Sequence, residues 1–184
     1  MYIPGHIAIG YLIVAGPALA RRVHINPTTA LFPALLGTLT PDIIDKTLQL
    51  TPFTPFGRTI AHSLLVFASL ILLWKLATLL RLLRPGGATI VGWWLAGYGS
   101  HLIVDLINDL FRGLEHTGYL FSAWIGWPFT NPDMHQLQWP VENPCQHCYS
   151  SLEIGLLAMT LAVAITHTLQ LKQGTLQLPG STEK

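Results

Sequence analysis

The sequence predicts an all-α protein, a polytopic membrane bundle of four to five helices. Of its 184 residues, 51% are hydrophobic and only 10% are charged, whereas an average soluble domain carries about 25% charged residues. Five apolar stretches follow one another, separated by turns that contain proline, glycine or arginine. We therefore expect the lipid bilayer as the main partner. A formal net charge of +1 provides no basic field for a nucleic acid, so no nucleic-acid partner is expected.

The first two apolar stretches are short and contain prolines. Residues 7–20 form the first stretch, which Pro17 is expected to break. The pair Asn26-Pro27 predicts a helix N-cap with proline at the first helical position. The second stretch runs from Thr28 to Leu39. It is expected to end at Thr40-Pro41, because the residue before a proline avoids the helical region.

The third and fourth stretches form a predicted helical hairpin. Residues 46–58 contain two prolines near a glycine and predict a surface loop. Thr59 is then expected to cap a helix from Ile60 to Leu83. A turn at Pro85-Gly86-Gly87 leads into the fourth helix, which we expect from Ala88 to about Leu110.

The last third of the chain contains an aromatic loop and one more helix. Residues 112–149 are polar, proline-rich and rich in tryptophan, which is favoured at membrane interfaces. Ser150 and Glu153 form a capping-box signature for a fifth helix from Ser151 to Leu171. We expect one integral-membrane helical domain over residues 1–171, with an interfacial loop at 112–149 and a polar tail at 172–184.

Ionisable residues in the apolar stretches provide the functional signal. His101 and Asp105 lie four residues apart, on one face of the fourth helix. Ionisable residues in hydrocarbon are costly and mark functional sites by default. If successive helices alternate in direction, one end of the bundle receives the candidate metal ligands His6, Asp42, Asp45, His62, His101 and Asp105.

The opposite end of the predicted bundle receives Arg21, Arg22, Arg81 and Arg84. The positive-inside rule puts these arginines in the cytoplasm and the ligand cluster on the extracytoplasmic side. One difficulty concerns depth along the third and fourth helices. At 1.5 Å per residue, His101 lies roughly 20 Å from the Pro85 turn and His62 roughly 33 Å from it. The hairpin must be staggered, or a second metal must bridge the difference, or one residue is not a ligand.

Three imidazoles and three carboxylates form a ligand set for divalent metals. We expect one or two ions, with zinc as the first choice and Mn, Fe or Mg as alternatives. A metal-free network of Asp, His and Arg58 that ties helix ends together is one alternative. A proton relay is another, since intramembrane His and Asp chains occur in transporters.

Four motifs in this order resemble the YdjM-type family of bacterial inner-membrane proteins, described as membrane-bound metal-dependent hydrolases. The motifs are Gly5-His6, Pro41-Asp42-Ile43-Ile44-Asp45, Arg58-Thr59-Ile60-Ala61-His62-Ser63 and Gly99-Ser100-His101-Leu102-Ile103-Val104-Asp105. The resemblance extends to about residue 130, where Trp127-Pro128-Phe129 is similar to the family's Pro-Phe segment. It implies a bacterial cytoplasmic (inner) membrane protein with a metal at the six candidate ligands. The order of the ligands is also distantly similar to zinc-dependent phospholipase C.

The expected function is metal-dependent hydrolysis of a lipid or membrane-associated phosphoester through a metal-activated water. Asp45 or Asp42 is expected to accept the proton of the water, with Asp45 favoured because Asp42 follows Pro41 and suits a ligand better. Arg58 is expected to neutralise a phosphate, and Glu115 is a candidate extra ligand or general acid. The alternatives are a metal-stabilised scaffold and an ion or proton transporter.

The arginine distribution makes a testable prediction of topology. With Cys145 and Cys148 replaced by serine, a cysteine at Thr54 should react with an impermeant thiol reagent in intact cells. A cysteine at Gly86 should react only after lysis, because that turn is expected in the cytoplasm. The reverse labelling pattern would place the candidate site on the cytoplasmic side.

Overall fold

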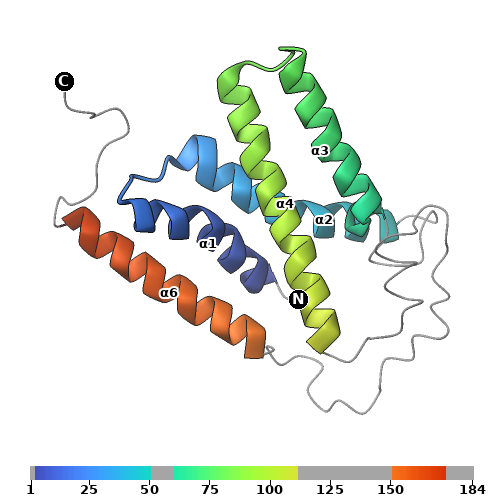
Figure 1. Ribbon diagram of the computed structural model, residues 1–184. Helices are drawn as coiled ribbons and strands as arrows, with labels where there is room; N and C mark the ends of the chain where they lie inside the picture. Colours follow the sequence, from blue (N-terminus) through green and yellow to red (C-terminus); the bar gives the residue numbers. More distant parts are fainter. Residues whose placement is uncertain (1–2, 51–59, 112–150, 173–184) are drawn as a thin grey trace, which may run out of the picture.

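The computed structural model describes residues 3–50, 60–111 and 151–172, and these residues confirm the all-α fold (Figure 1). The helices, in chain order, are α1 (Ile3–Arg21), α2 (Phe32–Gln49), α3 (Leu64–Leu79), α4 (Pro85–Phe111) and α6 (Ser151–Lys172). Two short helical turns, η1 (Pro27–Leu31) and η2 (Ile60–His62), precede α2 and α3. The predicted fifth helix and the Asn26 cap are confirmed, since the Asn26 side chain accepts from the backbone N–H groups of Thr28 and Thr29.

Helices α2 and α4 cross with their backbones in contact. A Cβ atom added to Gly37 of α2 would lie 2.0 Å from the Trp94 carbonyl oxygen. A Cβ atom added to Gly97 of α4 would lie equally close, 2.0 Å, to the Ala34 carbonyl oxygen. Glycine is therefore required at both positions, and small residues of this kind let membrane helices approach closely.

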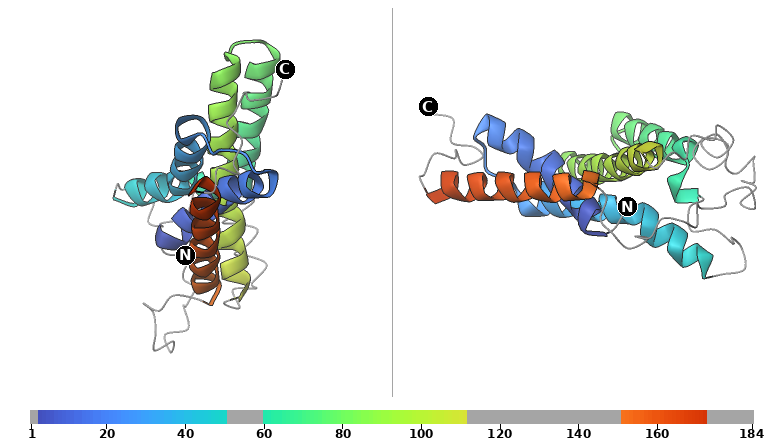
Figure 2. Two further views of the ribbon diagram at one scale, coloured as in Figure 1. Left: turned by 90° about the vertical axis from the view of Figure 1, so that its left-hand side faces the viewer. Right: turned by 90° about the horizontal axis from the view of Figure 1, so that it is seen from below.

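Helix α1 packs on this pair, and α6 lies alongside α1 (Figure 2). Gly10 of α1 faces the Thr38 side chain of α2, where an added Cβ would approach the methyl group to 2.9 Å. Ala8 and Leu12 of α1 share an apolar cluster with Val104 of α4 and Leu156 of α6. The N-terminal half of α1 is thereby held against both α2 and α4.

Two predicted helix interruptions at proline are wrong. Helix α1 continues through Pro17, and α2 continues through Pro41 to Gln49, which also shortens the predicted 46–58 loop. Pro41 has no N–H to donate to the Gly37 carbonyl. Pro41 is nevertheless fully buried, so tertiary packing of α2 outweighs the local preference of the residue before proline.

The predicted start of the third helix is also wrong. Helix α3 begins at Leu64 and not at Ile60, because Ser63 adopts an extended conformation (φ −74°, ψ 125°) and caps Val66. The helix ends at Leu79 and not at Leu83. Just beyond it, Arg81 has a φ of 56°, the left-handed conformation that closes helix ends. Arg22 (φ 54°) closes α1 in the same way.

Among the described residues, two helices are long and apolar enough to cross a membrane, α1 (Ile3–Arg21) and the segment Pro85–Asn108 of α4. The apolar helices Leu64–Leu79 and Ile154–Gln170 are shorter. No residue of α3 is buried, and its leucines face outward; Leu72 is 68% exposed and Leu79 78%. An apolar helix without a buried face is suited to a lipid environment.

The glycine contact predicts a sharp difference between two Gly→Ala substitutions. Gly97→Ala should lower the free energy of unfolding by about 1–3 kcal/mol or more, because its methyl group overlaps the Ala34 carbonyl. Gly155→Ala in α6 is the control, since an added Cβ meets nothing within 4 Å there. It should be neutral or stabilising by up to about 1 kcal/mol. Thermal unfolding in detergent measures both, and equal stability of the two variants would contradict the contact.

Candidate metal centre

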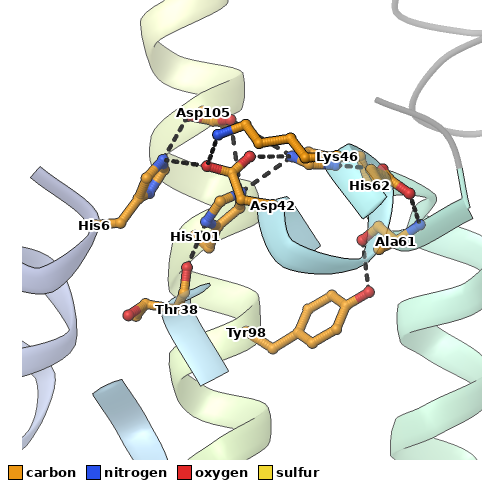
Figure 3. Close-up of polar contacts among 10 residues, drawn as sticks. His6, Thr38, Asp42, Lys46, Ala61, His62, Tyr98, His101 and Asp105 are labelled. Carbon is orange, nitrogen blue, oxygen red and sulfur yellow. Dashed lines mark hydrogen bonds and ion pairs between the residues drawn. The ribbon is translucent and has the colours of Figure 1, made fainter. Parts of the chain in front are cut away.

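The six predicted ligands converge on one buried cluster (Figure 3). They come from four segments that are distant in sequence: α1, α2, η2 and α4. Five of these residues are at most 1% exposed, and Asp42 is 9% exposed. The cluster members are His6, Asp42, Asp45, His62, His101 and Asp105.

The Nε2 atoms of the three histidines surround the Asp105 carboxylate. The His62 and His101 Nε2 atoms each lie 3.6 Å from Asp105 Oδ2, and His6 Nε2 lies 3.5 Å from Oδ1. The two Nε2 atoms of His62 and His101 are 3.1 Å apart. Asp42 completes the cluster, with carboxylate oxygens 3.9 Å from the Nε2 atoms of His6 and His62.

The shorter of these separations, 3.1–3.6 Å, are close to those of ligand atoms around one metal ion. Zinc–ligand bonds of about 2.0–2.1 Å place tetrahedral ligand atoms roughly 3.3–3.4 Å apart and octahedral ones roughly 3 Å apart. Two groups of three residues could each hold an ion, one formed by His6, Asp42 and His101 and the other by His62, His101 and Asp105. The groups share His101, and the distances between them fit one centre with several alternative ligands.

Two histidines are fixed in the tautomer that a metal ligand requires. His101 Nδ1 lies 2.6 Å from the Thr38 carbonyl oxygen, which can only accept, so Nδ1 carries the proton. His62 Nδ1 lies 2.7 Å from Asp45 Oδ2 and donates to that carboxylate in the same way. In the neutral rings both Nε2 atoms then present lone pairs to each other at 3.1 Å. Such a contact requires a cation between them, a proton or a metal ion.

Asp45 contacts His62 from behind and is outside both groups of three. Its Oδ2 accepts from His62 Nδ1, and its Oδ1 accepts from the Ala61 N–H at 3.0 Å. A carboxylate on the distal nitrogen of a metal-binding histidine orients the ring and increases its basicity. This geometry favours Asp45 as a positioning residue, and its predicted roles as metal ligand and general base stay untested.

The position of His62 in η2 explains how it lies beside His101. His62 belongs to this separate turn and not to α3, so a continuous helix does not set its distance from the Pro85 turn. Its Nε2 atom lies 3.1 Å from that of His101. The turn is held from two sides, because Tyr98 donates its hydroxyl to the Ala61 carbonyl (2.6 Å) while Asp45 accepts from the Ala61 N–H. Tyr98 itself stacks on Phe67 of α3.

Some functional residues were missed, and others are not described. The roles of Thr38 and Tyr98 depend on tertiary contacts, for which the sequence carries no signal. Lys46 Nζ lies 2.9 Å from Asp42 Oδ2. The two residues are four apart on one helix, and this spacing could have predicted the ion pair. The predicted catalytic residues Arg58 and Glu115 lie outside the described residues, as does the 112–149 loop.

The two positions of aspartate in this centre predict different losses of metal. Asp105→Asn should abolish binding of zinc, because Asp105 is within 3.6 Å of all three Nε2 atoms. Asp45→Asn should weaken it by about 10–100-fold, the usual effect of removing an outer partner. Metal content after dialysis against graded chelator measures both, with His167→Ala as an unaffected control. Equal loss in the two aspartate variants would make Asp45 a direct ligand.

The chain matches the family model of the YdjM inner membrane proteins over residues 1–174. Comparison with curated proteins and with solved structures gives no match. The likeness to zinc-dependent phospholipase C is not shown by these comparisons and stays a prediction. The family match extends beyond the motifs at the cluster to α6, the last helix of the fold. The chain therefore belongs to the YdjM inner membrane protein family.

Proposed function

We propose that this inner membrane protein is a metal-dependent hydrolase that acts on a lipid or membrane-associated phosphoester. The observation that carries the proposal is that the Nε2 atoms of His62 and His101 lie 3.1 Å apart beside the Asp105 carboxylate, while both Nδ1 atoms contact acceptors on the far side of the rings. A buried site of this kind is suited to binding a cation. Histidine and carboxylate ligands together favour zinc, with Mn, Fe or Mg as alternatives.

His62, His101 and Asp105 would hold the metal, and His6 stacks on the His101 ring at a centroid distance of 3.9 Å, which completes the set. A divalent ion bound there would supply a Lewis acid that polarises a phosphoryl oxygen and lowers the pKa of a water molecule. The chain contributes the orientation of the ligands through Asp45 and the Thr38 carbonyl. It also excludes bulk water, because the three imidazoles are at most 1% exposed.

Asp42 is the residue best placed to accept a proton. Its side chain is 13% exposed, whereas those of Asp45 and Asp105 are 0% and 1% exposed. Asp42 therefore lies at the open side of the cluster, where water and substrate would arrive. A carboxylate near the reacting atoms serves as a general base. Arg58 and Glu115 keep their predicted roles in phosphate neutralisation and in acid catalysis.

A non-catalytic scaffold is the second candidate, and the burial of the cluster favours it. A metal ion at this position would tie α1, α2, η2 and α4 together whether or not a reaction occurred. Transport is less favoured, because the nearest hydroxyl groups along α4 are used internally. Tyr98 donates to the Ala61 carbonyl and Ser100 to the Gly97 carbonyl, so neither continues a proton path toward Pro85.

Catalysis predicts that activity and metal binding can be separated at Asp42. Asp42→Asn should retain the metal through His62, His101 and Asp105 but lose hydrolysis by about 10²–10⁴-fold, as expected for removal of a general base. Asp42→Glu should recover part of the activity. The measurement is turnover of phosphodiester, phosphomonoester, carboxylester and amide substrates by the zinc-loaded protein. If the wild type has no metal-dependent turnover on any of them, the scaffold becomes the better proposal.

A further inference from the structure

We propose that an anionic phospholipid binds beside the metal centre, with one acyl chain in an apolar groove along α2 and its phosphate on Lys46. The inference rests on the proposed function, because it names the class of lipid that the hydrolase would receive. Its cation, Lys46, and three of its apolar residues, Ile3, Leu39 and Leu50, belong neither to the metal centre nor to the family motifs. The proposed site has two parts, an apolar groove and the Lys46 ammonium group.

The groove lies between the N-terminus of α1 and the second half of α2. Its volume is about 290 Å³, and it is open to the outside. Apolar side chains line most of it, and its polar lining residues are Asp42, Lys46 and Thr47, which lie along α2 between Leu39 and Leu50. The apolar lining consists of Ile3, Leu39, Ile43 and Leu50.

An acyl chain fits this groove better than a whole soluble ligand does. Ligand pockets usually measure about 300–1,000 Å³ and enclose most of the ligand, so this groove accommodates only part of a molecule. Three of its apolar residues are strongly exposed: Ile3 at 54%, Ile43 at 58% and Leu50 at 89%. In an inner membrane protein the neighbouring hydrocarbon is lipid, and a chain in the groove would cover these side chains.

Lys46 supplies the charge that selects an anionic headgroup. Its Nζ atom lies 2.9 Å from Asp42 Oδ2, while its side chain is 58% exposed (Figure 3). An ammonium group has three N–H donors, so Lys46 can keep Asp42 and still donate to a phosphate oxygen. Asp42 also lies 3.9 Å from His6 and His62 of the metal centre. A phosphate on Lys46 would therefore lie next to Asp42, one of the candidate metal ligands.

The test compares lipids that share acyl chains and differ in headgroup charge. The zinc-loaded full chain, purified in detergent, is titrated with phosphatidylglycerol, phosphatidylcholine or inorganic phosphate, and bound lipid is counted by native mass spectrometry. We expect the wild type to prefer phosphatidylglycerol by about fivefold, the contribution of one lysine near an anionic lipid. Lys46→Gln should remove this preference and Lys46→Arg should keep it. Lys75→Gln, an exposed lysine of α3, is the matched control and should change nothing.

A second variant tests the groove itself. Ile43→Trp places a larger side chain in the groove. It should weaken the binding of phosphatidylglycerol and of phosphatidylcholine equally and leave the metal content unchanged. The proposal is overturned if Lys46→Gln keeps the preference for phosphatidylglycerol, or if inorganic phosphate alone binds Lys46 as well as the lipid does. Loss of metal-dependent turnover with lipid binding intact would overturn the proposed function and leave this site standing. Metal-dependent turnover without a preference for phosphatidylglycerol would overturn this lipid site and leave the proposed function standing.

Discussion

Two helices that touch backbone to backbone cannot slide past each other, and α2 and α4 touch at Gly37 and Gly97. The cluster residues follow these glycines at matching intervals. Asp45 lies eight residues beyond Gly37, and His101 and Asp105 lie four and eight residues beyond Gly97. A slip of one turn would move one set by about 5.4 Å. That shift exceeds the 3.1–3.9 Å separations of the facing nitrogen and oxygen atoms. The centre therefore forms only in the register of α2 and α4 that the glycine contact fixes.

The contact places the ligands but does not orient them. Orientation comes from hydrogen bonds on the far side of the rings, which His62 Nδ1 donates to Asp45 and His101 Nδ1 donates to the Thr38 carbonyl. Thr38 is completely buried and directly follows Gly37. The same close approach that permits the crossing thus brings a backbone carbonyl to His101. Buried carboxylates and imidazoles are costly without partners, and a shared cation would offset that cost.

The sequence predicted the helical class, the fifth helix, the Asn26 cap and the six residues that meet in the centre. Spacing and hydropathy suffice for these because they are local, or because ionisable residues in apolar helices have few uses. The continuation of α2 through Pro41 was not predictable, since it depends on the tertiary packing that buries Pro41 and not on a local preference. The departure of His62 from α3 depends on Tyr98 and Asp45, which contact Ala61 from different helices. The position of Asp45 behind His62, and not in front of the centre, required the folded chain.

The ligands of the centre come from residue 6 to residue 105, and this spread has a consequence for synthesis of the chain. A ribosome delivers His6, Asp42 and Asp45 well before His101 and Asp105 exist. During that interval Asp42 has its Lys46 partner on the same helix, but neither early carboxylate has an imidazole from η2 or α4, and the binding site is incomplete. The centre can therefore form only after α4 has been made. The fourth helix thus completes a centre whose first ligands are made much earlier.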